Sequence, residues 1–282
     1  MTPRPPATLL RRARVSAAGP VALATMPDAV RRGVRVVLTD IDDTLSTHGR
    51  IPARAYAALE RLRAAGKRVV PITGRPAGWC DHIARMWPVD GVVGENGALS
   101  MRHDDAARTL VRRFVDDAAT RARNRARLAG VAAAIVRDVP GCAVASDQQY
   151  RETDLAIDWC EDVPPLPRAA VDAIVARMEA AGLTAKVSSI HVNGWFGAYD
   201  KLTMTRTLLA EAFGVDMDRE RDAIVYAGDS PNDAPMFAFF PNAVGVANVR
   251  AFLDRIATPP RYVTRAEGGA GFAELADFLL AP

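Results

Sequence analysis

The chain alternates short runs of β-branched and other apolar residues with longer stretches whose apolar positions recur at helical spacing. The short runs predict buried strands and the longer stretches predict amphipathic helices. In the first and last thirds of the chain, strand and helix follow one another, which is typical of βαβ units around a parallel sheet. The expected strands are residues 34–39, 68–72, 89–93, 223–227 and 243–246, and the expected helices are residues 53–65, 201–213 and 271–280.

The middle of the chain has a different pattern, with a hairpin followed by mixed helices and strands. The expected elements are a hairpin at 98–101 and 109–114, helices at 116–137 and 168–181, and strands at 142–145, 155–159, 184–187 and 189–192. We therefore expect an α/β fold in which residues 34–99 and 194–282 form a parallel-sheet core. Residues 100–193 are expected to form an inserted α+β domain.

Residues 1–33 are rich in proline, alanine and arginine, and their six arginines and one aspartate carry a local charge of +5, against +3 for the whole chain. The basic character therefore belongs to this segment, and the body has no basic stripe that favours nucleic acid. We expect a disordered tail, or a start upstream of a native one at Met26. An export signal is less favoured, because Gly19-Pro20 interrupts its apolar stretch. No apolar run approaches the ~20 residues of a membrane span.

Cysteine and histidine spacing disfavours two further kinds of site. Cys80, Cys142 and Cys160 form no C-x-x-C pair, and the four histidines fall in no H-E-x-x-H frame. A disulfide framework and a zinc site are therefore not expected. This composition predicts a cytoplasmic protein.

Polar residues gather where the predicted strands of the core end. The four segments are 39–45, 71–75, 94–97 and 228–233, and Asp200-Lys201 opens a helix between the last two. Ligands of an open parallel sheet bind at the carboxyl ends of its strands. These side chains are therefore expected to lie close together.

The acids among them point to a metal ion. If Asp40, Asp229 and Asp233 converge, their mutual repulsion of roughly 4 kcal/mol per pair requires raised pKa values or a divalent cation. Oxygen ligands without histidine or cysteine favour Mg²⁺, which pairs naturally with phosphate. The Thr73 hydroxyl, the Gly74 backbone and the Lys201 ammonium suit a phosphoryl group.

In these residues the sequence resembles the haloacid dehalogenase superfamily of phosphatases. The first family motif, D-x-D-x-T, matches residues 40–44, and the fourth, G-D-x-x-N-D, matches residues 228–233. Thr73 and Lys201 match the second and third motifs. The resemblance covers essentially residues 34–282. It implies a Rossmann-like core with an α/β cap of the larger type, as in Cof-type, sucrose-phosphate and mannosyl-3-phosphoglycerate phosphatases, and with substrate identity set by the cap.

The resemblance also implies roles for individual residues. Asp40 is the expected nucleophile, and Asp42 is the expected acid and base. The expected ligands of Mg²⁺ are Asp40, the backbone carbonyl of Asp42, Asp229 and Asp233. The expected phosphate contacts are Thr73, Gly74, Lys201 and Asn232. Asp43 departs from the family pattern, because many relatives have glycine there.

Together these implications predict a Mg²⁺-dependent phosphomonoester hydrolase that works through an aspartyl-phosphate on a sugar phosphate or similar small metabolite. Two alternatives stay open: a sugar phosphomutase, and a sugar-phosphate binding protein without catalysis. Arg75, Asn96 and Asn193 are candidate substrate contacts, with a salt bridge or a hinge as the alternative. No nucleic-acid or membrane partner is expected, and the chain is expected to be a monomer or a homodimer.

Overall fold

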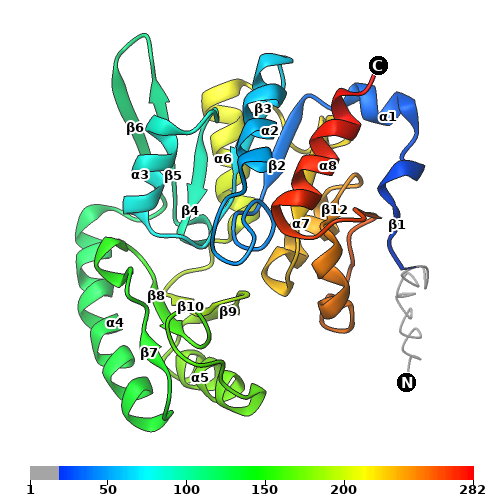
Figure 1. The fold of residues 1–282 in the computed structure, drawn as a ribbon. Coiled ribbons are helices and arrows are strands. Elements are labelled where there is room, and N and C mark those ends of the chain that lie inside the picture. The colour runs from blue at the N-terminus through cyan, green and yellow to red at the C-terminus, as the bar shows by residue number, and fades with distance from the viewer. Residues whose placement is uncertain (1–18) are drawn as a thin grey trace, which may run out of the picture.

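The computed structural model describes residues 19–282, and a six-stranded sheet lies at its centre (Figure 1). The strands are β1 (Val21–Ala22), β2 (Val36–Thr39), β3 (Arg68–Pro71), β11 (Ile224–Gly228), β12 (Val244–Gly245) and β13 (Tyr262–Val263). Their order is β1-β13-β12-β11-β2-β3, and every neighbouring pair is parallel. The α/β fold with a parallel core sheet is thus confirmed.

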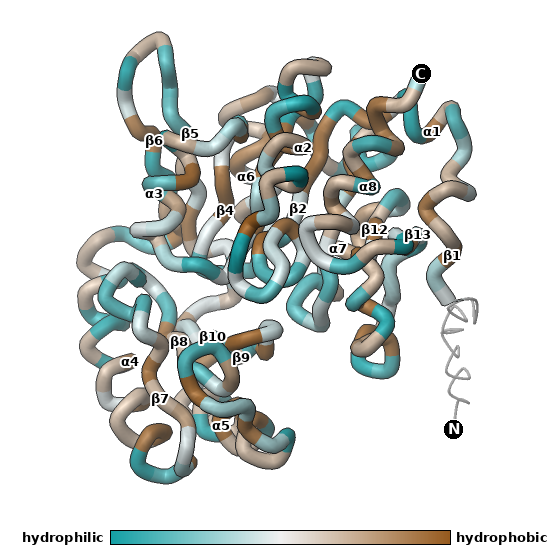
Figure 2. The backbone as a smooth tube through the Cα atoms, viewed as in Figure 1, coloured by the Kyte–Doolittle hydropathy of each residue, from teal (hydrophilic) through white to brown (hydrophobic). Residues whose placement is uncertain are grey.

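Helices cover both faces of this sheet, which is why its central strands are continuously apolar. On one face Val37 packs in a cluster with α2 (Ala53–Ala64), α3 (Ala77–Met86) and α8 (Gly268–Leu280). On the other, Val36 and Leu38 pack with α6 (Lys201–Phe213) and α7 (Ala234–Phe239). Figure 2 shows hydrophobic segments concentrated on these inner strands. Further short helices of the core include α1 (Asp28–Gly33), η1 (Leu23–Thr25), η4 (Arg221–Ala223), η5 (Pro231–Asp233) and η6 (Ala247–Arg255).

The predicted hairpin belongs to the core and not to the insert. β4 (Val92–Gly94), β5 (Leu99–Asp104) and β6 (Thr109–Phe114) form an antiparallel sheet, and a bridge between Ile72 and Val93 continues it from β3. Leu99 and Met101 are buried in the core cluster that includes α3. A domain boundary between residues 99 and 100 was therefore wrong, because the apolar face of β5 needs the core for its burial.

The part of the insert that stands apart, called the cap below, follows β6. It consists of α4 (Ala118–Asp138), β7 (Ala143–Val144), η3 (Gln148–Tyr150), β8 (Leu155–Asp158), α5 (Arg168–Ala180), β9 (Thr184–Val187) and β10 (His191–Trp195). Its antiparallel sheet has the order β7-β8-β10-β9 and its own hydrophobic cluster. Figure 1 shows it below the core on the left. Because β10 extends to Trp195, the expected return to the core at residue 194 falls inside a strand.

Residues 19–33 are part of the fold, which corrects the expectation of a tail over 1–33. β1 pairs with β13, and Leu23 and Met26 are buried in the core. Arg31 is also buried, and its guanidinium donates to the carbonyls of Phe278 and Pro282. A two-residue strand leaves too little periodic pattern to recognise in a sequence. The rest of the expected tail, residues 1–18, lies outside the described residues.

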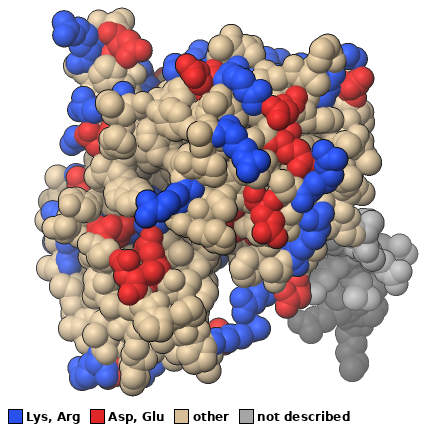
Figure 3. All heavy atoms as spheres, in the orientation of Figure 1, with Lys and Arg blue, Asp and Glu red and all other residues tan. Residues whose placement is uncertain are grey.

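The surface carries charges of both signs. Figure 3 shows acidic and basic side chains interspersed over the visible face. Within residues 19–282, no helix combines the length and the hydropathy that crossing a bilayer requires.

A strained turn marks the point where the chain leaves β4. In η2 (Glu95–Gly97) all three residues have positive φ, and a Cβ on Gly97 (φ 104°) would lie 2.0 Å from the carbonyl oxygen of Asp200. Asp200 caps α6, so Gly97→Ala would push on the helix that carries Lys201. We expect Gly97→Ala to lower the free energy of unfolding by about 3 kcal/mol, measured by urea denaturation.

Gly130→Ala is the matched control for this change. Gly130 lies inside α4 with open space around its Cα, so the added methyl should raise the free energy of unfolding by up to about 1 kcal/mol. Equal stability of the two variants would contradict the close packing of Gly97 on Asp200.

Candidate active site

The polar segments meet where β2, β3 and β11 end. Because these strands are parallel neighbours, Asp40 after β2, Thr73 after β3 and Asp229 after β11 emerge at one edge of the sheet. All three are buried. The topology therefore collects residues that are far apart in the sequence.

A buried cluster of one cation and three acids lies at this edge. Nζ of Lys201 is 2.6 Å from Oδ1 of Asp40 and 2.8 Å from Oδ1 of Asp233. Asp40, Asp229 and Asp233 each offer a carboxylate oxygen within 4.8 Å of the others. The N-cap contact of Asp200, which accepts from the backbone N–H of Thr203, fixes the helix start that presents Lys201.

Burial and crowding disfavour the charged form of the carboxyl groups in this cluster. Burial raises the pKa of Asp40, an effect that Lys201 opposes and Asp233 reinforces. Burial, together with Asp233 and Asp40, likewise raises the pKa of Asp229. One ammonium cannot neutralise three carboxylates, so the cluster suits a further cation.

Asp233 and Asp229 are held by different partners. Asp233 accepts from Lys201 and from the Tyr226 hydroxyl on one oxygen, and from the backbone N–H groups of Asp229 and Ser230 on the other. Its lone pairs are thus largely occupied. Asp229 accepts from the Thr44 hydroxyl and the Asn248 amide, each at 3.2 Å.

The turn after β2 aims Asp42 at the same site. Backbone N–H groups of Leu45 and Ser46 both donate to the carbonyl of Ile41, which closes the turn. Asp43 adopts φ 54°, a left-handed conformation that glycine adopts at no steric cost and aspartate tolerates. This explains how an aspartate is accommodated at this position. The carbonyl oxygen of Asp42 accepts no hydrogen bond from the residues that the structure describes.

Arg75 is bound to Asp42 and not free to meet a ligand. Its Nε lies 3.0 and 3.1 Å from the two carboxylate oxygens of Asp42, and its Nη2 lies 2.8 Å from Oδ1. The guanidinium also lies over the Trp79 ring, 4.5 Å from the centroid. Nη2 is 2.7 Å from Oε1 of Glu161, which belongs to the cap. The structure therefore supports the salt-bridge alternative for Arg75.

The remaining predicted phosphate contacts border the same space. Oγ1 of Thr73 accepts from the backbone N–H of Arg75 at 2.9 Å, which leaves its hydroxyl hydrogen available. A cavity at this edge of the sheet, called the catalytic cavity below, is lined by Asp40 and Asp42 and also by Gly74 and Asn232. Oδ1 of Asn232 accepts from the Ser230 hydroxyl at 2.8 Å.

Asn96 and Asn193 both contact a cap carboxylate. Their amides lie 3.4 and 3.2 Å from Oδ2 of Asp154, which also pairs with Arg151. Arg151 in turn donates to the carbonyl of Gly74 at 2.8 Å. Asn193 lines the catalytic cavity as well, whereas Asn96 is not among its lining residues. These contacts favour the hinge alternative for Asn96.

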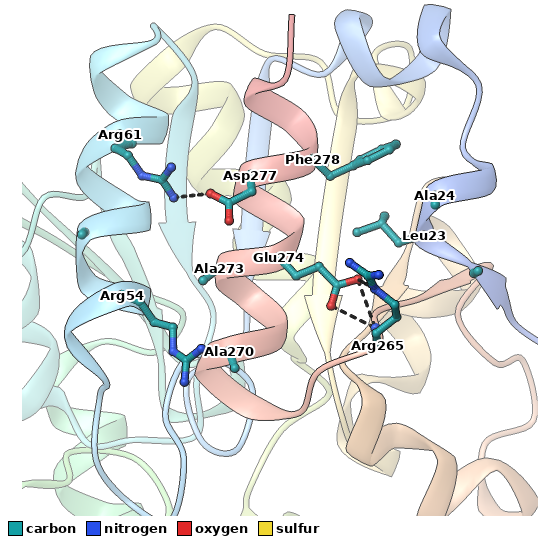
Figure 4. A pocket seen from close by; sticks show the side chains of 12 residues that line it. Leu23, Ala24, Arg54, Arg61, Arg265, Ala270, Ala273, Glu274, Asp277 and Phe278 are labelled. Carbon is teal, nitrogen blue, oxygen red and sulfur yellow. Dashed lines mark hydrogen bonds and ion pairs between the residues drawn. The ribbon is translucent and has the colours of Figure 1, made fainter.

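The catalytic cavity is small. Its volume is about 10 Å³, and the cap contributes Ser188, Ser189 and His191 to its lining. A larger cavity of about 790 Å³ lies elsewhere, between α2, α8 and η1 (Figure 4). The Arg61–Asp277 and Arg265–Glu274 ion pairs face that cavity. The larger of these two cavities is therefore not the one beside the acidic cluster.

Comparison with known proteins agrees with this geometry. Residues 37–125 match the family model of haloacid dehalogenase-like hydrolases. These residues, which run from β2 into α4, are similar to that family. No curated protein sequence matches the chain.

Solved structures share the fold of most of this chain. A Thermoplasma acidophilum protein is 18% identical with a TM-score of 0.66, over 87% of this chain and 98% of that one. The sucrose-phosphatase from Synechocystis, solved with sucrose and phosphate, is 16% identical with a TM-score of 0.60, over 88% and 98%. The C-terminal domain of C. albicans trehalose-6-phosphate phosphatase is 12% identical with a TM-score of 0.68, over 93% and 98%. At these identities the likeness establishes the fold.

The sequence did not predict several side chains around the candidate site. Tyr226, Asn248 and Glu161 are not among the site residues that the sequence predicts. Tyr226 precedes the fourth motif by two residues, which is a weak signal. Asn248 and Glu161 had none, because only the fold brings them to Asp229 and Arg75.

Proposed function

We propose that this chain is a Mg²⁺-dependent phosphomonoester hydrolase that works through an aspartyl-phosphate intermediate on a sugar phosphate or similar small metabolite. The observation that carries the proposal is a buried Asp40 in contact with Lys201, with Asp42 facing the same cavity. The known phosphatases with the same fold support this activity.

The donor set fits a magnesium ion. Buried carboxylates with raised pKa values, crowded around one lysine, gain from a divalent cation with oxygen ligands. Asp40, Asp229 and the free carbonyl of Asp42 would hold it, and Asp233, whose oxygens already accept four hydrogen bonds, would orient them. When bound, the ion supplies positive charge that stabilises the transferring phosphoryl group.

The chain's own residues then perform the transfer. A carboxylate oxygen of Asp40 attacks phosphorus, and the bond to the leaving alcohol breaks with its electron pair passing to the alcohol oxygen. That oxygen takes a proton from Asp42. Lys201 and Thr73 stabilise charge on the phosphoryl oxygens. In the second half, Asp42 accepts a proton from a water whose oxygen attacks phosphorus, which releases phosphate and restores Asp40.

The ester must enter while the cap is displaced. A cavity of about 10 Å³ is at the lower limit for one water molecule, far below the size of a sugar phosphate. We propose that cap closure then excludes bulk water from the reaction.

Phosphate release from the purified chain tests this function. With Mg²⁺ and a panel of phosphate monoesters that includes sugar phosphates and p-nitrophenyl phosphate, we expect release of inorganic phosphate in many turnovers. An isomerised sugar phosphate without free phosphate would indicate a phosphomutase instead. Tight binding without any turnover across the panel would indicate a binding protein.

A further inference from the structure

The arginine that lines the catalytic cavity already pairs with carboxylates of the chain. Arg75 is the one lysine or arginine among the described residues that line the cavity. Its Nε and Nη2 contact Asp42, its Nη2 and Nη1 contact Glu161, and its Nη1 contacts Asp147 at 3.5 Å. These contacts use all five N–H groups of a guanidinium. Arg75 therefore has no donor left for an anionic group of a substrate.

Contacts with neighbouring groups fix Glu161 beside Arg75 and favour its charged form. The carboxylate of Asp158 accepts from the backbone N–H groups of Glu161 and of both neighbours, at 2.8–2.9 Å. Nε2 of His191 lies 2.9 Å from Oε2 of Glu161. Burial alone would raise the pKa of Glu161, but its contacts with His191 and Arg75 outweigh burial and lower it to about 2.

The carboxylates beside the cavity outnumber the arginines that pair with them. Asp42, Glu161 and Asp147 pair with Arg75, and Asp147 also pairs with Arg151, which in turn binds Asp154. These four carboxylates share two arginines, so an excess of negative charge remains there even when Asp42 carries the proton that it donates. The cap adds the hydroxyls of Ser188 and Ser189, which suit hydroxyl groups of a ligand.

Space for the rest of a larger alcohol lies next to the catalytic cavity. A neighbouring cavity of about 370 Å³ shares Ser188, Ser189 and Ser230 with it. Its lining includes Trp159 and also Arg168 and Arg255. In a large ester, only the groups close to the phosphate therefore lie near these carboxylates. Small esters test the effect of the carboxylates best, because all their groups are close to the phosphate.

We propose that the substrate has an uncharged polyol as its leaving group, and that Glu161 is a specificity-determining residue that disfavours esters with a second anionic group near the phosphate. The inference rests on the proposed phosphatase function. Its physical basis is repulsion between like charges in a partly buried site, where the arginine that lines the catalytic cavity is already paired with carboxylates.

Two three-carbon esters that differ mainly in one charge test the proposal. We expect kcat/KM for glycerol 3-phosphate to exceed that for 3-phosphoglycerate by at least about tenfold. Glu161→Gln should reduce this ratio by about tenfold. We use the ratio because a looser cap or partial unfolding would lower kcat/KM for both esters together and leave the ratio unchanged. Glu179→Gln, on an exposed position of α5, should leave the ratio unchanged.

The salt dependence of the wild-type ratio is a second measurement that needs no variant. Raising the salt concentration should bring the ratio closer to one, because salt screens the repulsion between Glu161 and the carboxylate of 3-phosphoglycerate. Hydrolysis of both esters at equal kcat/KM, or a ratio that Glu161→Gln does not change, would overturn the inference and leave the phosphatase function standing. Absence of phosphate release from every ester, p-nitrophenyl phosphate included, would overturn both.

Discussion

Asp40→Asn is expected to lower kcat for phosphate esters by about 10⁴-fold or more, because an amide cannot replace the carboxylate that attacks phosphorus. Asn has nearly the same shape, so substrate binding should survive. Steady-state phosphate release measures kcat, and calorimetric titration with a phosphate ester measures the binding that remains.

The same change should not unfold the protein. Asp40 shares its buried surroundings with Asp229 and Asp233, so the loss of one negative charge relieves repulsion. We expect the Tm of Asp40→Asn to equal or exceed that of the wild type. Asp105→Asn, on the exposed hairpin turn, is the control that should keep full activity. Wild-type turnover in Asp40→Asn would exclude Asp40 as the nucleophile.

Removal of divalent cations is expected to lower activity by about 10³-fold, and added Mg²⁺ should restore it. The cause is the charge of the cluster, in which one lysine faces three carboxylates. Phosphate release after treatment with EDTA, followed by readdition of Mg²⁺, measures the effect.

Thermal stability provides a test of the metal site that does not depend on turnover. Because the cluster exists only in the folded chain, Mg²⁺ at 100 times its Kd should stabilise the native state by about 2.7 kcal/mol. Asp229→Asn should remove most of the Mg²⁺-dependent rise in Tm, whereas Asp105→Asn should retain it. Full activity in EDTA, or a Tm that Mg²⁺ does not change, would contradict the proposed metal site.

The local pattern of the chain was sufficient to predict most elements of the core. Largely apolar runs rich in β-branched residues, such as residues 34–39, need burial on both faces, and that requirement follows from composition alone. Polar residues directly after such runs, as in Asp40 and Asp229, must leave the sheet at its edge. For this reason the positions of the acidic cluster could be predicted without coordinates.

Elements with little periodicity of their own were misplaced. The two-residue strand β1 and the hairpin β5–β6 owe their positions to contacts with β13 and with the α3 cluster. Their sequences match several environments equally well, and only the complete fold selects one. For this reason the boundary between core and cap in the structure differs from the predicted one.

Contacts between side chains that lie far apart in the sequence could also not be predicted without the fold. The chemical types of the site, an aspartate pair, a lysine and two further acids, can be recognised from the linear order of residues because each follows a strand or opens a helix. The side chains that contact those groups cannot be recognised in this way. Glu161 reaches Arg75 across two domains, and Tyr226 and Lys201 share one oxygen atom of Asp233. Such contacts depend on the angle between packed elements, which no local stretch of chain encodes.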